Sequence, residues 1–179
     1  MPMFVLPNNS EKFLSFSIGN VVFKNNFQFM QESLENLTIN LVKKEISENS
    51  NVFKYLSSQF KDEKLQLLKK KGIFPYDYLD SLDRFKEDKL PSKEAFYNRL
   101  QNTNVSDEDY HHALNVWNTF KMKTFGDYHD IYLKTDVLLL TDIFKNFRSL
   151  CLDYYKLDPV HYYGTPSIAW DACQIKNLN

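Results

Sequence analysis

The chain has 179 residues, a formal net charge of −1 and two cysteines, and these values exclude several classes of protein. Hydrophobic residues make up 43% and charged residues 25%, a balance that excludes a disordered chain. A protein that binds nucleic acid on its own through the phosphates usually has a marked positive net charge, which this chain lacks. Any contact with nucleic acid must therefore be local or be supported by parts of a larger protein. Cys151 and Cys173 have no ligand-like spacing, which predicts neither a disulfide framework nor a zinc site and fits an intracellular setting. No run of 18 apolar residues occurs, so we expect no membrane partner.

The first half of the chain predicts a β-hairpin followed by helices. Apolar and polar residues alternate on either side of Gly19-Asn20, which predicts a hairpin over about Leu14–Phe23. In this register Ile18 faces Val21 and Phe16 faces Phe23. Leucines at helical spacing then predict a helix within residues 27–41, and the lysine-rich residues 43–64 predict a short helix and a connecting loop.

The second half predicts two longer helices, so the expected fold class is a helix-rich α+β fold. Gly and Pro in Lys71–Tyr76 predict an irregular extended segment. Ser106 with Asp109 forms a capping box, which predicts a helix from about Asp107 to Phe120. The longest helix is expected from about Asp127 to Tyr155. Trp117 and Trp170 are expected in the core.

The long predicted helix carries a carboxylate on the side that should be buried. Its apolar stripe runs back from Ile143 through Leu139 to Asp136 and Tyr132, in steps of four, three and four residues. Burying a carboxylate costs several kcal/mol unless it is paired, hydrogen-bonded or bound to metal. Asp136 could therefore cap a loop or meet a core Lys or Arg, or it could be a metal ligand with Tyr132 orienting an attacking water. Periodicity leaves both interpretations open.

The segment Tyr128–Leu140 resembles the third exonuclease motif of family B DNA polymerases, a Tyr followed four residues later by an Asp. The resemblance extends from about Lys12 to Cys173. The chain also resembles the protein-primed polymerases of virus-like Polinton (Maverick) elements, in which similar segments follow in the same order. These segments are Gly72–Tyr78, Leu90–Tyr97, Ser106–Tyr110 and His161–Asp171.

This resemblance implies part of a ribonuclease H-like 3′–5′ exonuclease domain, with an N-terminal β-hairpin and a long C-terminal helix. Residues 1–155 would be the C-terminal part of that domain, and residues 156–179 the start of the connection to a polymerase domain. The family holds two Mg²⁺ or Mn²⁺ ions with four carboxylates, and such a pair stabilises the attacking and leaving oxygens of a phosphodiester. Asp136 matches one of the four, and the motifs that supply the others are not present, so the metal site is expected to be incomplete here.

The resemblance also implies roles for individual residues. Tyr132, Asp136 and Lys71 match catalytic positions, with Lys71 assisting the scissile phosphate; alternatively, Lys71 is a solvated member of the run Lys69–Lys71. Asn26 and Phe27 match a site that contacts the primer end, although the family usually has Asp-Ser where this chain has Asn25-Asn26.

The function implied is that of a fragment of a DNA-directed DNA polymerase with proofreading ancestry. Its partners would be the primer 3′ end of DNA, dNTPs and a terminal protein primer, in a nuclear, viral or mobile-element setting. The isolated chain is expected to be inactive, because one carboxylate cannot organise two metal ions. The alternative is a non-catalytic binding or scaffold remnant of a mobile-element polymerase.

Overall fold

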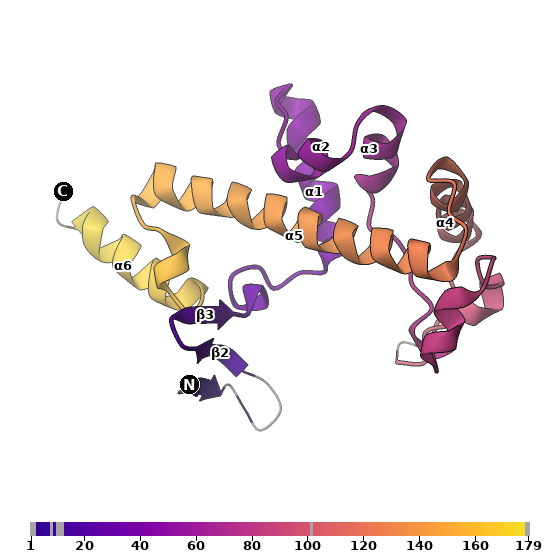
Figure 1. Cartoon of the computed structure of the whole chain (residues 1–179). Coiled ribbons are helices and arrows are strands. Elements are labelled where there is room, and N and C mark those ends of the chain that lie inside the picture. The colour runs from indigo at the N-terminus through magenta and orange to yellow at the C-terminus, as the bar shows by residue number, and fades with distance from the viewer. Residues whose placement is uncertain (1–2, 8, 10–12, 101, 178–179) are drawn as a thin grey trace. The chain divides into compact units, whose positions relative to one another are not determined.

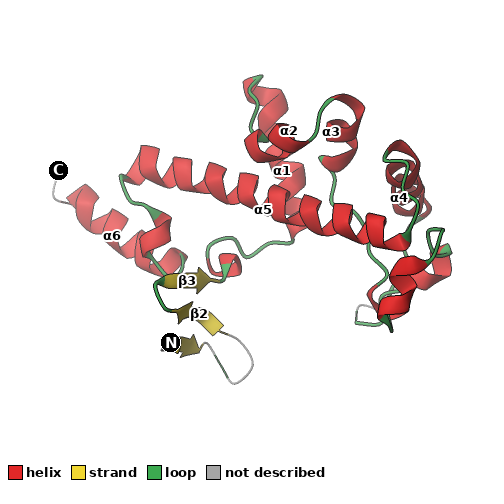
Figure 2. Cartoon of the chain, viewed as in Figure 1, coloured by secondary structure: helices red, strands yellow, loops and turns green. Residues whose placement is uncertain are grey.

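The computed structural model describes residues 3–7, 9, 13–100 and 102–177, and these form a helix-rich α+β fold (Figures 1 and 2). The chain divides into two compact units. The first unit comprises Met1–Ser33 with Phe144–Asn179, and the second comprises Leu34–Ile143. The longest helix, α5 (Phe125–Tyr155), contributes residues to both units. Among the described helices, none has the length and hydropathy needed to cross a membrane.

The first unit contains a three-stranded antiparallel sheet in the order β1 (Met3–Pro7), β2 (Phe13–Ile18) and β3 (Val21–Lys24). The predicted hairpin is confirmed, because Ile18 pairs with Val21 and Phe16 with Phe23. Gly19 has a φ of 60°, as expected for the first central residue of a type II′ hairpin turn. Strand β1 was not predicted, because the continuous apolar run Met3–Leu6 lacks the alternation that marks a strand with one solvated face.

The C-terminal part of the first unit is tied down by polar contacts. Arg148 on α5 makes a bidentate ion pair with Asp158, with its closest N–O distance at 2.6 Å. The turn η5 (Pro159–His161) follows, and then helix α6 (Thr165–Asn177). Gly164 leaves room for the carbonyl oxygen of Gln28, since a Cβ there would lie 3.1 Å from it. Trp170 on α6 is 68% exposed, so its prediction as a core residue is wrong.

The second unit is helical. It contains α1 (Leu34–Glu48), α2 (Lys54–Gln59), α3 (Asp62–Leu68), α4 (Asp107–Thr119) and the first part of α5. Short 3-10 turns lie between α3 and α4, namely η2 (Tyr76–Tyr78), η3 (Leu82–Lys86) and η4 (Lys93–Phe96). Helix α1 begins only at Leu34 and is preceded in the first unit by the turn η1 (Asn26–Gln28), where the side chain of Asn25 accepts a hydrogen bond from the amide of Phe27.

The predicted N-cap of α4 at Ser106 is confirmed, and Asp109 contacts the hydroxyl of Ser106 and not its backbone amide. The hydroxyl of Ser106 accepts a hydrogen bond from the amide of Asp109 at 3.0 Å and donates to its carboxylate at 2.6 Å. Acidic residues in this first turn also interact favourably with the helix dipole. The helix buries Ala113 and Val116, and the first of these joins an aromatic core formed with Phe74, Phe96, Phe125 and Tyr128.

A carboxylate that the sequence analysis did not single out joins two helices of this unit. Asp142 on α5 is 1% exposed and accepts hydrogen bonds from the amides of Tyr55 and Leu56, both at 2.9 Å. These amides belong to the first turn of α2, whose preceding residue Phe53 offers no side-chain cap. Asp142 therefore caps α2 from a distant point in the sequence. Burial raises the pKa of its carboxyl group, and the backbone hydrogen bonds oppose that rise.

We expect Asp142→Ala to lower the free energy of unfolding by roughly 2–4 kcal/mol, because the buried amide of Leu56 and the partly buried amide of Tyr55 lose their acceptor. Asp142→Asn should cost less, since its carbonyl oxygen still accepts one hydrogen bond. Urea unfolding followed by circular dichroism measures both changes. Asp153→Ala, which alters an exposed carboxylate on the same helix, is the control and should have little effect. Equal stability of Asp142→Ala and the control would contradict the capping role.

Candidate functional site

Three residues singled out in the sequence, namely Lys71, Tyr132 and Asp136, lie together in the structure. The ammonium group of Lys71 joins the other two. It donates to the two carboxylate oxygens of Asp136 at 2.9 and 3.2 Å and to the hydroxyl of Tyr132 at 2.7 Å. The hydroxyl of Tyr132 also lies 2.6 Å from that of Tyr76. Lys71 is 61 residues from Tyr132 and 65 from Asp136 in the sequence. The cluster therefore depends on tertiary folding.

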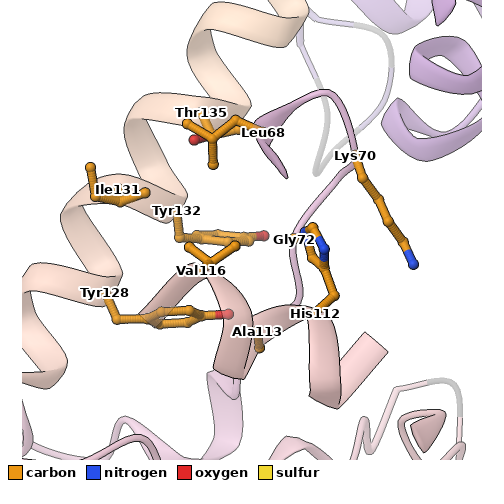
Figure 3. A pocket seen from close by; sticks show the side chains of 10 residues that line it. All are labelled: Leu68, Lys70, Gly72, His112, Ala113, Val116, Tyr128, Ile131, Tyr132 and Thr135. Atoms are coloured by element: carbon orange, nitrogen blue, oxygen red, sulfur yellow. The ribbon is translucent and has the colours of Figure 1, made fainter. Parts of the chain in front are cut away.

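The backbone geometry explains why the segment after α3 lies against α5. Tyr132 and Asp136 are one helical turn apart, so their side chains project from the same face. A Cβ on Gly72 would lie 3.5 Å from the ring of Tyr132, so the segment passes close to this ring. Tyr128, one turn earlier, donates from its hydroxyl to the carbonyl of Ile73 at 2.6 Å. Figure 3 shows Tyr128 and Tyr132 one above the other on α5, with their hydroxyls directed toward the Gly72 segment.

Burial and charge keep both phenols protonated. The pKa of Tyr132 is raised well above its ordinary value, first by burial, then by its hydrogen bond with Tyr76 and by the negative charge of Asp136. The pKa of Tyr128 is raised by burial and by the same carboxylate. The side chains of Lys71 and Asp136 are 24% and 22% exposed, so the ion pair is partly shielded from water. The site therefore places the protonated hydroxyl of Tyr132 beside a partly shielded ion pair.

A cleft of about 530 Å³ opens beside this cluster. The cleft is lined by residues of the cluster, namely Lys71, Tyr76 and Tyr132. It is also lined by Tyr97 and Asn104. Its size lies within the range of small-molecule sites, roughly 300–1,000 Å³. Two acidic residues also contribute, but each faces a cation: Asp109 lies 2.8 Å from Lys70, and Asp77 lies 3.9 Å from Arg99. The cleft is therefore aromatic and close to neutral.

A second, much smaller cavity of about 20 Å³ lies between α4 and α5. Ten side chains line it (Figure 3), most of them apolar. The volume suits about one water molecule. The hydroxyl of Thr135, which lines the cavity, is buried without a hydrogen-bond partner. Burial also lowers the pKa of the nearby His112 from its ordinary value, which favours a neutral imidazole at pH 7. This cavity is a packing feature and is too small for an organic ligand.

Asn26 and Phe27, matched by resemblance to a primer-binding site, lie in the turn η1 of the first unit. Phe27 is 55% exposed, so its ring is accessible to a partner. The structure thus brings Lys71, Tyr132 and Asp136 together in the second unit and places Asn26 and Phe27 in the first. Tyr76 was missed as a site residue, because an exposed tyrosine after Pro75 has no periodic signal.

The residues around Asp136 do not fit a two-metal site. No group of three or more His, Cys, Asp or Glu side chains suited to a metal ion occurs in the part of the chain that the structure describes. Both oxygens of Asp136 contact the ammonium of Lys71, which neutralises the carboxylate without a metal ion.

Comparisons of the chain with protein-family models, with curated proteins and with solved structures gave no match.

We expect Lys71 and Asp136 to be energetically coupled. Lys71→Met leaves a partly buried carboxylate unpaired, and Asp136→Asn leaves the ammonium with the hydroxyl of Tyr132, so each change should destabilise the chain. In a double-mutant cycle the coupling free energy should be about 0.5–3 kcal/mol. Urea unfolding of the two single variants and the double variant measures it.

The matched control is the exposed pair Lys86 and Asp83, whose nitrogen and oxygen lie 2.7 Å apart. The cycle Lys86→Met with Asp83→Asn should show no measurable coupling, because water screens this pair. If the effects of Lys71→Met and Asp136→Asn added as fully as those of the control pair, Lys71 and Asp136 would not be coupled in the folded state.

Proposed function

We propose that the chain is part of the 3′–5′ proofreading exonuclease domain of a protein-primed family B DNA polymerase. The observation that supports this most is the meeting of Lys71, Tyr132 and Asp136 within hydrogen-bonding distance. The three residues come from two segments that match separate motifs of the family, and Lys71 is 61 and 65 residues from Tyr132 and Asp136 in the sequence. A ribonuclease H-like fold for the complete domain is part of the proposal.

The chemistry of the cluster suits phosphodiester hydrolysis. An ammonium beside a scissile phosphate would offset the negative charge that develops in the transition state. The protonated hydroxyl of Tyr132 would position an attacking water, and its raised pKa keeps it a donor. Tyr76 and Tyr97 line the adjoining cleft, and exposed aromatic rings stack on the bases of single-stranded DNA.

In the complete enzyme, Mg²⁺ or Mn²⁺ would supply the Lewis acid, and Asp136 would be one of several carboxylates that hold it. The other carboxylates would come from the longer polymerase chain. In that enzyme the ammonium of Lys71 would face the substrate phosphate.

The ion pair itself favours a second candidate function. Because Lys71 pairs with both oxygens of Asp136, the cluster can also be stable as a structural feature, which suits a non-catalytic binding or scaffold remnant of a mobile-element polymerase. The coding sequence around this chain distinguishes the two. An Asp-x-Glu motif upstream and an Asp-Thr-Asp motif downstream in the same reading frame would support the polymerase, and stop codons in both directions would support the remnant.

We expect the purified chain neither to extend a primer nor to degrade single-stranded DNA with Mg²⁺ or Mn²⁺, because too few carboxylates surround Asp136. Gel analysis of a labelled primer tests this. Metal-dependent 3′–5′ degradation that disappears in Asp136→Ala would contradict it and would show that other residues of the chain complete the site.

In the full-length polymerase, Asp136→Ala should abolish most proofreading and leave primer extension largely intact, because the two reactions use separate sites. Tyr132→Phe should be milder and cost about 10²–10³ in exonuclease rate, the usual loss for one positioned donor. The measurement is the removal rate of a mismatched primer end, beside extension and thermal melting. Equal exonuclease rates in the wild type and Asp136→Ala would reject the catalytic role.

A further inference from the structure

The sheet of the first unit has one face, here named the outer face, on which two rows of paired side chains are entirely apolar. In the observed register, the first row is Met3, Ile18 and Val21, and the second row is Val5, Phe16 and Phe23. None of these six side chains is buried, and four of them are between 45 and 67% exposed. A contiguous apolar surface of this kind marks a site of interaction.

The polar side chains of β2 and β3 lie on the opposite, inner face, namely Ser15, Ser17 and Lys24. Ser15 is buried, and the ammonium of Lys24 donates to the carbonyl oxygens of Val160 and Tyr162. The segment that contains η5 therefore packs on the inner face. An antiparallel sheet with one covered face normally turns its polar side chains to water. Here the polar side chains lie on the covered face, and the apolar outer face lacks a cover.

We propose that the outer face is the contact surface of a homodimer, in which the sheets of two copies of this chain pack face to face about a two-fold axis. A two-fold contact needs a surface that complements itself, because the same patch is used by both copies. The outer face meets this condition. Its six side chains carry no charge, so the rotation that pairs two copies brings no like charges together.

The shape and chemistry of the outer face favour a second sheet as the partner. None of its six side chains donates or accepts a conventional hydrogen bond, so it offers no specific contact to a polar or charged surface. The rings of Phe16 and Phe23 stack across β2 and β3, with centroids 4.6 Å apart, and form a ridge beside the smaller side chains of Ile18 and Val21. In the proposed dimer this ridge packs against the row of smaller side chains of the second copy, as the inner faces of two stacked sheets interdigitate.

The size of the outer face predicts a weak dimer. Two such faces in contact would bury on the order of 1,000 Å² in total, which is the lower end of the range for specific interfaces. We therefore expect a dissociation constant in the micromolar range. None of the residues of the Lys71 cluster takes part, so the dimer does not depend on the proposed exonuclease.

The test is sedimentation velocity of the full chain at concentrations from far below to far above the micromolar range. A reductant is present, so that Cys151 and Cys173 cannot cross-link copies. The mass should rise from one chain to two. Val21→Lys should weaken the association by at least about tenfold, because it buries an ammonium in an apolar contact.

The matched control is Val22→Lys. Val21 and Val22 are neighbours on β3 and are 58 and 55% exposed, but Val22 lies on the inner face. This variant should leave the dissociation constant within about a factor of two of the wild type. Met3→Lys and Phe4→Lys form a second pair of this kind on β1, with Met3 on the outer face and Phe4 on the inner face. Circular dichroism and thermal melting show which variants fold, and the second pair carries the test if a member of the first unfolds.

Three results would overturn the proposal. A mass of one chain at every concentration would mean that something other than a second copy covers the outer face. Equal weakening by both members of each pair would indicate pairing along the edge strands β1 or β3 in place of face-to-face packing. A mass that continues to rise beyond two chains would show an open association and not a closed two-fold contact.

Discussion

The partly buried carboxylate of Asp136 imposes the main constraint on the second unit, because it needs a positive partner once α5 packs against its neighbours. Lys71 meets that need and so holds the irregular segment after α3 against the helix. The hydroxyls of Tyr128 and Tyr132 reinforce the same contact, one through a backbone carbonyl and the other through the ammonium. The position of Tyr76, and with it one part of the aromatic cleft, follows from this arrangement.

Two partly buried lysines differ in the groups that contact their ammonium nitrogens. Lys71 lies against a carboxylate, so its charge is matched within the chain. Lys24 lies against backbone carbonyls and over the ring of Tyr163, all of which are neutral partners. The first arrangement is an ion pair, and in the second neutral groups alone orient the ammonium.

Helix α5 carries several of the polar side chains that make long-range contacts. Its first half carries Tyr128, Tyr132 and Asp136 at one-turn intervals, so these side chains project on one face. Further along, Asp142 caps α2, and Arg148 holds the segment that leads to η5. A single 31-residue helix thus positions polar groups in each of the two units.

The sequence by itself determined the features that depend on neighbouring residues. Gly19-Asn20 between alternating runs determined the hairpin and its register, and Ser106 with Asp109 determined the start of α4. The helical period placed Asp136 and Tyr132 on one face, but it could not choose between a metal ligand and an ion pair. Only the tertiary structure decided that Lys71 is the partner, that Asp142 caps α2, that β1 joins the sheet and that Trp170 is exposed. These outcomes depend on which distant segments pack together, and the energy of such contacts is absent from any local pattern.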